Sequence, residues 1–166
     1  MKRIGILGST GSIGRSTLSV IESHPDRFQL VTMAAGANVE AALEQARRWK
    51  PRVLSLASEQ DADRIGIELK AEGLGAIEIV HGQAGTVRVA THKEVDFVVS
   101  AIVGVAGLKA TYEGVRARKQ VGLAKYSQSR PTDRAEYSRH RPGFALRLVL
   151  LQLADRLRRR ADIGIS

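Results

Sequence analysis

Cysteine is absent from the 166 residues, which excludes disulfide bonds, thiolate metal sites and cysteine nucleophiles. Aromatic residues make up only 4% of the chain, so platforms on which nucleic-acid bases stack are not expected. No apolar run approaches the roughly 18 residues of a membrane-spanning helix. The first residues also lack the long apolar stretch of a signal peptide. These absences predict a cytoplasmic protein without a membrane partner.

Positive charge is concentrated in the last quarter of the chain. The net charge is +9, of which residues 1–124 contribute only +3 and residues 125–166 contribute +6. Nine of the ten basic residues in this tail are arginines. The basic cluster at residues 156–160 suits phosphate contacts, but a solvated charge run is favoured because no aromatic side chains accompany it. We therefore expect no nucleic-acid partner.

Residues 1–124 alternate short apolar runs with helical periodicity, a pattern typical of stacked βαβ units around a parallel sheet. Strands are predicted at residues 3–7, 28–33, 53–56, 77–80, 95–99 and 121–123. Helices are predicted between them, with a short one at residues 82–90 and a last one defined by Leu108, Tyr112 and Val115. The expected fold is α/β, a Rossmann-like doubly wound parallel sheet. Residues 125–166 break the pattern and form an irregular or helical basic tail, with apolar helical spacing at residues 144–157.

A glycine-rich segment stands between the first strand and the first helix. It reads Gly8-Ser9-Thr10-Gly11-Ser12-Ile13-Gly14. Gly8 permits the unusual dihedrals of the turn, Gly11 leaves the backbone bare for a pyrophosphate, and Gly14 lets the helix pack closely on its strand. Thr10 and Ser12 add hydroxyl groups beside the positive end of the helix dipole. The context favours a dinucleotide site, and an ordinary glycine-rich turn without a ligand remains the alternative.

The end of the second strand bears on the choice between NAD and NADP. NAD-binding domains usually place an acid about 20 residues beyond the glycines to bond the ribose 2′-hydroxyl. No carboxylate occurs here before Glu40, and Asn38 opens the next helix, where an anion is welcome. These features favour NADP, although residues 34–38 contain no lysine or arginine to pair with the 2′-phosphate.

Four segments together resemble 1-deoxy-D-xylulose 5-phosphate reductoisomerases, and the resemblance covers only the N-terminal NADPH-binding domain of that family, from residue 1 to about 124. The segments are residues 5–14, Ser16-Thr17-Leu18, residues 35–39 and residues 100–108. The resemblance implies conversion of 1-deoxy-D-xylulose 5-phosphate to 2-C-methyl-D-erythritol 4-phosphate in non-mevalonate isoprenoid synthesis, with NADPH and a Mg or Mn ion. It also implies a homodimer, which the sequence leaves open.

The resemblance assigns cofactor roles by position. Thr10, Gly11, Ser12 and Ile13 would touch the phosphates and ribose. Gly36 and Asn38 would hold the adenosine end, with Ala37 standing where the family commonly has lysine.

The sequence departs from the family after Leu123. The family continues Leu-Ala-Asn-Lys-Glu, whereas this chain continues Leu123-Ala124-Lys125-Tyr126-Ser127. Lys125 is the one candidate for the family's substrate-binding lysine, and neither catalytic residues nor metal ligands are predicted in the chain. We infer two regions, an NADPH-binding Rossmann-type domain at residues 1–124 and an atypical tail at residues 125–166 that is translated out of frame. The expected function is a reductoisomerase fragment that binds NADPH and is inactive alone. The alternatives are an NADP(H)-binding module without catalysis and a non-functional remnant.

Overall fold

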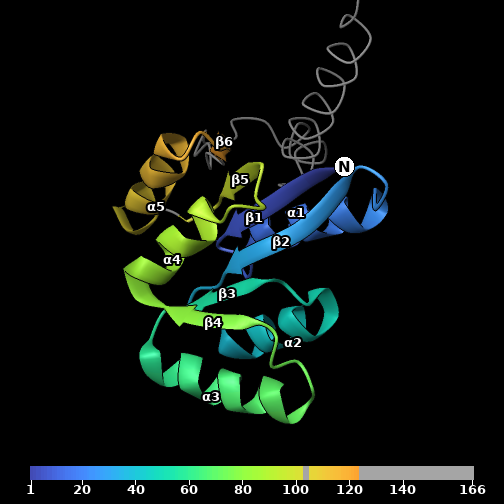
Figure 1. Cartoon of the computed structure of the whole chain (residues 1–166), viewed down its shortest axis with the longest axis vertical. Helices are drawn as coiled ribbons and strands as arrows, with labels where there is room; N and C mark the ends of the chain where they lie inside the picture. Colours follow the sequence, from blue (N-terminus) through green and yellow to red (C-terminus); the bar gives the residue numbers. More distant parts are fainter. Residues whose placement is uncertain (103–104, 124–166) are drawn as a thin grey trace, which may run out of the picture.

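A computed structural model describes residues 1–102 and 105–123. Over these residues the chain forms a parallel sheet of six strands in the order β4-β3-β2-β1-β5-β6 (Figure 1). The strands are β1 (Lys2–Leu7), β2 (Phe28–Ala34), β3 (Val53–Leu56), β4 (Glu78–His81), β5 (Phe97–Ser100) and β6 (Gln120–Leu123). The chain moves outward from β1 through β2 to β4 and then returns to β5 on the other side of β1. This reversal of strand order lies beside β1, and ligands of such sheets bind where the order reverses.

Helices cover both faces of the sheet. They are α1 (Ser12–Ser23), α2 (Val39–Trp49), α3 (Glu59–Ala71), α4 (Gly82–Thr91) and α5 (Val105–Arg116). Figure 1 shows α1, α2 and α3 on one side of the strands and α4 and α5 on the other. The buried residues accordingly form two apolar clusters, a larger one under α1–α3 and a smaller one under α4 and α5. The predicted Rossmann-like doubly wound fold is confirmed.

The strand predictions agree with the structure to within two residues. The predicted bounds of the third strand, residues 53–56, are those observed. The fifth strand begins at Phe97 rather than Val95, because the Val95 amide closes a turn onto the His92 carbonyl at 3.0 Å. Pairing with β1 starts only at Phe97, opposite Ile4. The short helix predicted at residues 82–90 is present as α4.

The last helix is present, but its three apolar marker residues do not face the core. Leu108, Tyr112 and Val115 are 65%, 60% and 56% exposed. The buried side of α5 instead carries Gly107, Ala110 and Gly114. A Cβ at Gly107 would lie 2.8 Å from the Ile102 Cβ, and one at Gly114 would lie 3.7 Å from the Ala90 Cβ of α4. Small residues therefore allow this helix to lie close to α4 and to the segment that precedes it.

A carboxylate joins the amino ends of β1 and β5. The Asp96 carboxylate accepts three hydrogen bonds from Arg3. The donors are the Arg3 backbone amide at 3.0 Å, the Arg3 Nε at 3.0 Å and the Arg3 Nη2 at 2.8 Å. These bonds to Arg3 hold the pKa of the Asp96 carboxyl below its usual value. The contact fixes the start of the strand that leads to the glycine-rich segment.

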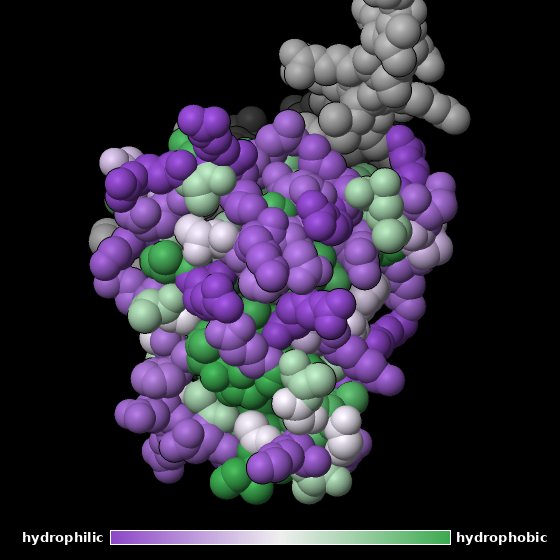
Figure 2. Space-filling model, viewed as in Figure 1, coloured by the Kyte–Doolittle hydropathy of each residue, from purple (hydrophilic) through white to green (hydrophobic). Residues whose placement is uncertain are grey.

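The face shown in Figure 2 is largely hydrophilic, with apolar residues visible over its lower half, where Figure 1 places β3, β4 and α3. Within the described ranges, none of the helices combines the length and the apolarity that crossing a bilayer requires. The predicted tail at residues 125–166, with its apolar segment at residues 144–157, lies outside the described residues.

Candidate functional site

The glycine-rich segment lies at the carboxyl edge of the sheet, between β1 and α1. Gly8 has φ +87°, and a Cβ there would lie 3.1 Å from the backbone carbonyl of Ala101. The amides of Gly8 and Ser9 both donate to the Ala34 carbonyl at 2.8 Å. The turn is therefore fastened to the end of β2, and its first position requires glycine.

Gly14 is where α1 rests on the turn. A Cβ at this position would lie 2.2 Å from the Gly8 carbonyl oxygen and 2.5 Å from that of Ser9. Since backbone atoms cannot move aside as a flexible side chain would, the packing of the helix on the loop depends on glycine here.

Gly11 differs, because no contact among the described residues requires glycine at that position. It is the N-cap of α1 with φ −73° and ψ 169°, a conformation open to any residue. A Cβ there would meet only the Gly8 carbonyl oxygen at an ordinary 3.5 Å. The position is exposed, so the absence of a side chain at Gly11 leaves room for a ligand to approach the backbone.

The backbone amides at the amino end of α1 have no acceptors within residues 1–102 and 105–123. Gly11 provides no side-chain cap, and the first turn contains no acidic residue. The backbone amides of Thr10, Ser12, Ile13 and Gly14 donate to no acceptor among the described residues. By contrast, Asn38 caps α2 and Ser58 caps α3. Free amides at the positive end of a helix dipole are suited to bind a phosphate.

The loop between β2 and α2 supplies a second set of predicted residues. Gly36, Ala37 and Asn38 are all exposed, and no atom lies within 4 Å of the place where a Gly36 Cβ would be. The Asn38 side-chain oxygen accepts from the Ala41 amide at 3.0 Å, so this oxygen is engaged by the helix. Because β1 and β2 are neighbours with Leu7 paired to Ala34, the structure brings the two predicted loops to one edge.

Two side chains that the sequence did not identify hold the glycine loop. The Gln45 amide nitrogen, from α2, donates to the Ser9 carbonyl at 3.1 Å, and the Arg15 guanidinium donates to the Thr10 carbonyl at 3.0 Å. Periodicity could not assign these roles. The one signal for Gln45 is a polar residue bordering the buried stripe formed by Ala42, Leu43 and Ala46.

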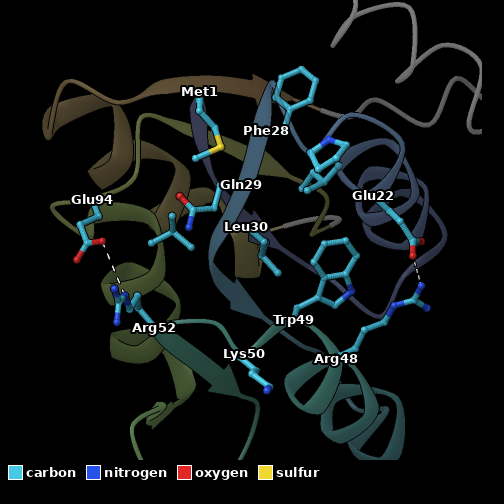
Figure 3. A pocket seen from close by; sticks show the side chains of 13 residues that line it. Met1, Glu22, Phe28, Gln29, Leu30, Arg48, Trp49, Lys50, Arg52 and Glu94 are labelled. Atoms are coloured by element: carbon cyan, nitrogen blue, oxygen red, sulfur yellow. Dashed lines mark hydrogen bonds and ion pairs between the residues drawn. The ribbon is translucent and has the colours of Figure 1, made fainter.

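A hollow of about 690 Å³ lies at the opposite, amino edge of the sheet. Figure 3 shows Trp49 and Leu30 in its wall, with Arg48 turned toward Glu22 and Arg52 toward Glu94. Because these basic side chains are paired with carboxylates, and because the hollow lies at the far end of the strands from residues 8–14, it forms no part of the candidate site.

Neither a metal site nor the predicted substrate residue is found in the part of the chain that the structure describes. No cluster of three or more histidine, aspartate or glutamate side chains in residues 1–102 and 105–123 is placed to hold a metal ion. Lys125 lies outside the described residues.

A sequence model of the 1-deoxy-D-xylulose 5-phosphate reductoisomerase family matches residues 4–126. The chain belongs to this family. The reductoisomerase of Anaeromyxobacter sp. (strain K) is 48% identical over 124 residues, and that of Glaesserella parasuis is 46% identical over the same length. These matches cover 75% of this chain and 31% of each relative. The chain thus spans about a third of the length of the curated reductoisomerases that it matches.

Solved reductoisomerase structures share the fold. A reductoisomerase in complex with magnesium superposes with a TM-score of 0.71 at 33% identity, covering 75% of this chain and 31% of that one. The Zymomonas mobilis reductoisomerase in complex with NADPH superposes with a TM-score of 0.67 at 33% identity, covering 75% of this chain and 32% of that one. A further relative holds NADPH, fosmidomycin and magnesium together, with a TM-score of 0.69 at 32% identity over 73% of this chain and 29% of that one.

Proposed function

We propose that this chain binds NADPH at the carboxyl edge of β1 and β2, as the cofactor-binding portion of a 1-deoxy-D-xylulose 5-phosphate reductoisomerase. The observation that carries the proposal is the uncapped amino end of α1, where the amides of Thr10, Ser12, Ile13 and Gly14 have no acceptor among the described residues. A diphosphate there gains hydrogen bonds from bare backbone and the favourable end of the dipole. The exposed Gly11 allows it to approach closely.

The loop at Gly36, Ala37 and Asn38 is proposed to hold the adenosine end. No carboxylate stands in residues 34–38 to accept from a ribose 2′-hydroxyl or to repel a 2′-phosphate. The nearest acid, Glu40, accepts a hydrogen bond from the Arg64 guanidinium at 2.6 Å, which offsets its charge. The arrangement favours NADPH over NADH. The preference is modest because Ala37 provides no positive charge.

The full reaction is proposed for the longer family protein rather than for this chain alone. In the longer protein, bound NADPH would supply the hydride that reduces an aldehyde derived from the sugar phosphate, and the protein would have to hold that substrate against the nicotinamide. The described residues offer no carboxylate cluster for the magnesium that solved relatives contain, so we derive no step through a metal. We propose that this chain binds the cofactor without turnover.

The test is thermal unfolding of the full chain with NADPH and NADH in parallel, together with an assay for NADPH oxidation in the presence of 1-deoxy-D-xylulose 5-phosphate and Mg²⁺. NADPH at about 100 times its Kd should stabilise the folded chain by about 2.7 kcal/mol, with a smaller effect from NADH at the same concentration. Absence of any NADPH-induced shift would contradict cofactor binding. Turnover by the chain alone would contradict the proposed division between binding and catalysis.

A further inference from the structure

Gln45 connects α2 to the glycine loop through one hydrogen bond. Its side-chain nitrogen donates to the carbonyl oxygen of Ser9 at 3.1 Å, and Ser9 is completely buried. Residues 9 and 45 are far apart in sequence, so this is a tertiary contact between the helix that begins at the adenosine loop and the loop that precedes α1.

The contact helps to fix the direction of the Ser9–Thr10 peptide, whose amide is one of those without an acceptor among the described residues. The Ser9 carbonyl and the Thr10 amide belong to one planar trans peptide, in which C=O and N–H point in opposite directions. A donor that holds the carbonyl on the α2 side therefore aims the Thr10 N–H away from α2. This amide has no acceptor among the described residues. Its direction therefore decides whether it can donate a hydrogen bond to a ligand at the end of α1.

The two polar atoms of the Gln45 side chain are not equally well placed. Its nitrogen satisfies the Ser9 carbonyl, and because Ser9 is buried, methionine at this position would leave that carbonyl without its donor. Its side-chain oxygen is buried and has no partner among the described residues, which is unfavourable. The residue therefore keeps an unpaired oxygen in order to hold this one carbonyl of the glycine loop.

We propose that Gln45 is a positioning residue for NADPH, which holds the Ser9–Thr10 peptide so that its amide meets the cofactor diphosphate. This inference rests on the proposed cofactor binding. Without the contact, the peptide loses one of its restraints, while the bonds of the Ser9 amide to Ala34 and of the Thr10 carbonyl to Arg15 remain. A less restrained peptide must be ordered when the cofactor binds, and this opposes association.

The test compares Gln45→Met with Arg47→Met in the full chain. Arg47 lies on the same helix, and its guanidinium pairs with Glu68 of α3 at 2.7 Å and with Glu72, the residue that follows α3. Its variant therefore loses side-chain contacts that do not involve the loop. The NADPH Kd should rise about 5-fold in Gln45→Met, the equivalent of one hydrogen bond of about 1 kcal/mol. The Kd should stay unchanged in Arg47→Met. Adenosine 2′-monophosphate, which lacks the diphosphate, should bind equally to all three proteins.

Two results would overturn the inference. One is an NADPH Kd in Gln45→Met that equals the wild-type value. The other is an equal loss of affinity for NADPH and for adenosine 2′-monophosphate, which would indicate that the substitution disturbs the fold of the whole site. Amide hydrogen exchange without cofactor gives a separate measurement. Gln45→Met should exchange faster at Gly11, whose amide donates to the Gly8 carbonyl within the loop, and unchanged exchange there also contradicts the inference. Failure of the wild-type chain to bind NADPH would instead refute the proposed function.

Discussion

Replacing Gly11 with alanine tests whether this glycine is kept for a ligand or for the fold. The added methyl group would meet only the Gly8 carbonyl oxygen at 3.5 Å, in a backbone conformation that alanine adopts without strain. Reduced freedom of the unfolded chain contributes about 0.4–1 kcal/mol of stability, and the poorer N-cap removes a similar amount. We expect the free energy of unfolding without cofactor to change by less than about 1 kcal/mol.

Cofactor binding should respond very differently. If the methyl group keeps the diphosphate from two backbone amides, the loss of about 2.7 kcal/mol raises the NADPH Kd about 100-fold. At an NADPH concentration that stabilises the wild type by about 2.7 kcal/mol, the variant would gain only about 0.4 kcal/mol. In thermal unfolding this reduces a shift of about 10 °C to about 1–2 °C.

Gly14→Ala is the matched control, since its Cβ would lie 2.2 Å from the Gly8 carbonyl oxygen. It should destabilise the chain without cofactor, by about 3 kcal/mol. The reasoning is refuted if Gly11→Ala retains the full NADPH-induced shift, or if it unfolds as readily as Gly14→Ala.

Three further predictions concern other parts of the structure. Ala37→Lys should lower the Kd for NADPH several-fold with little effect on the Kd for NADH, because it adds a positive charge only where the 2′-phosphate is proposed to lie. Equal changes of both Kd values in titrations would show that the 2′-phosphate lies elsewhere. The Asp96 contribution to stability, which comes from a carboxyl pKa lowered by Arg3, should be fully present above the unfolded pKa of about 4 and disappear as the pH falls through the folded pKa. Urea unfolding of wild type and Asp96→Asn should therefore differ at pH 7 and converge in strong acid, and a difference that persists in strong acid would contradict the assignment. Replacing Leu108 and Tyr112 together by glutamine should leave the Tm nearly unchanged, because both side chains are exposed; a large drop in Tm in thermal unfolding would show that they are part of the core.

The sequence predicted most of the fold because the strands of a parallel sheet are short, apolar and separated by helical periodicity. Val53–Leu56 illustrates this, since every one of its residues is buried. The glycine loop was equally predictable, because its three glycines follow a strand and open a helix. The resemblance of this loop and of residues 100–108 to reductoisomerases also predicted the family to which the chain belongs.

The face of α5 could not be predicted in the same way. Periodicity identifies large apolar residues, but this helix packs through Gly107, Ala110 and Gly114, and a close approach needs small residues rather than large ones. Gln45 was missed for a different reason. Its partner is the backbone carbonyl of Ser9, and a side-chain contact to backbone leaves no pattern of residue types in the sequence.

The most direct test of the central claim is a titration of the ¹⁵N-labelled full chain with NADPH, followed by the chemical shifts of the backbone amides. The account predicts the largest changes at Thr10, Ser12, Ile13 and Gly14, with smaller ones at residues 36–38. Saturating NADPH that leaves the amides of residues 10–14 unshifted, or that shifts the residues around the hollow at the amino edge instead, would contradict it.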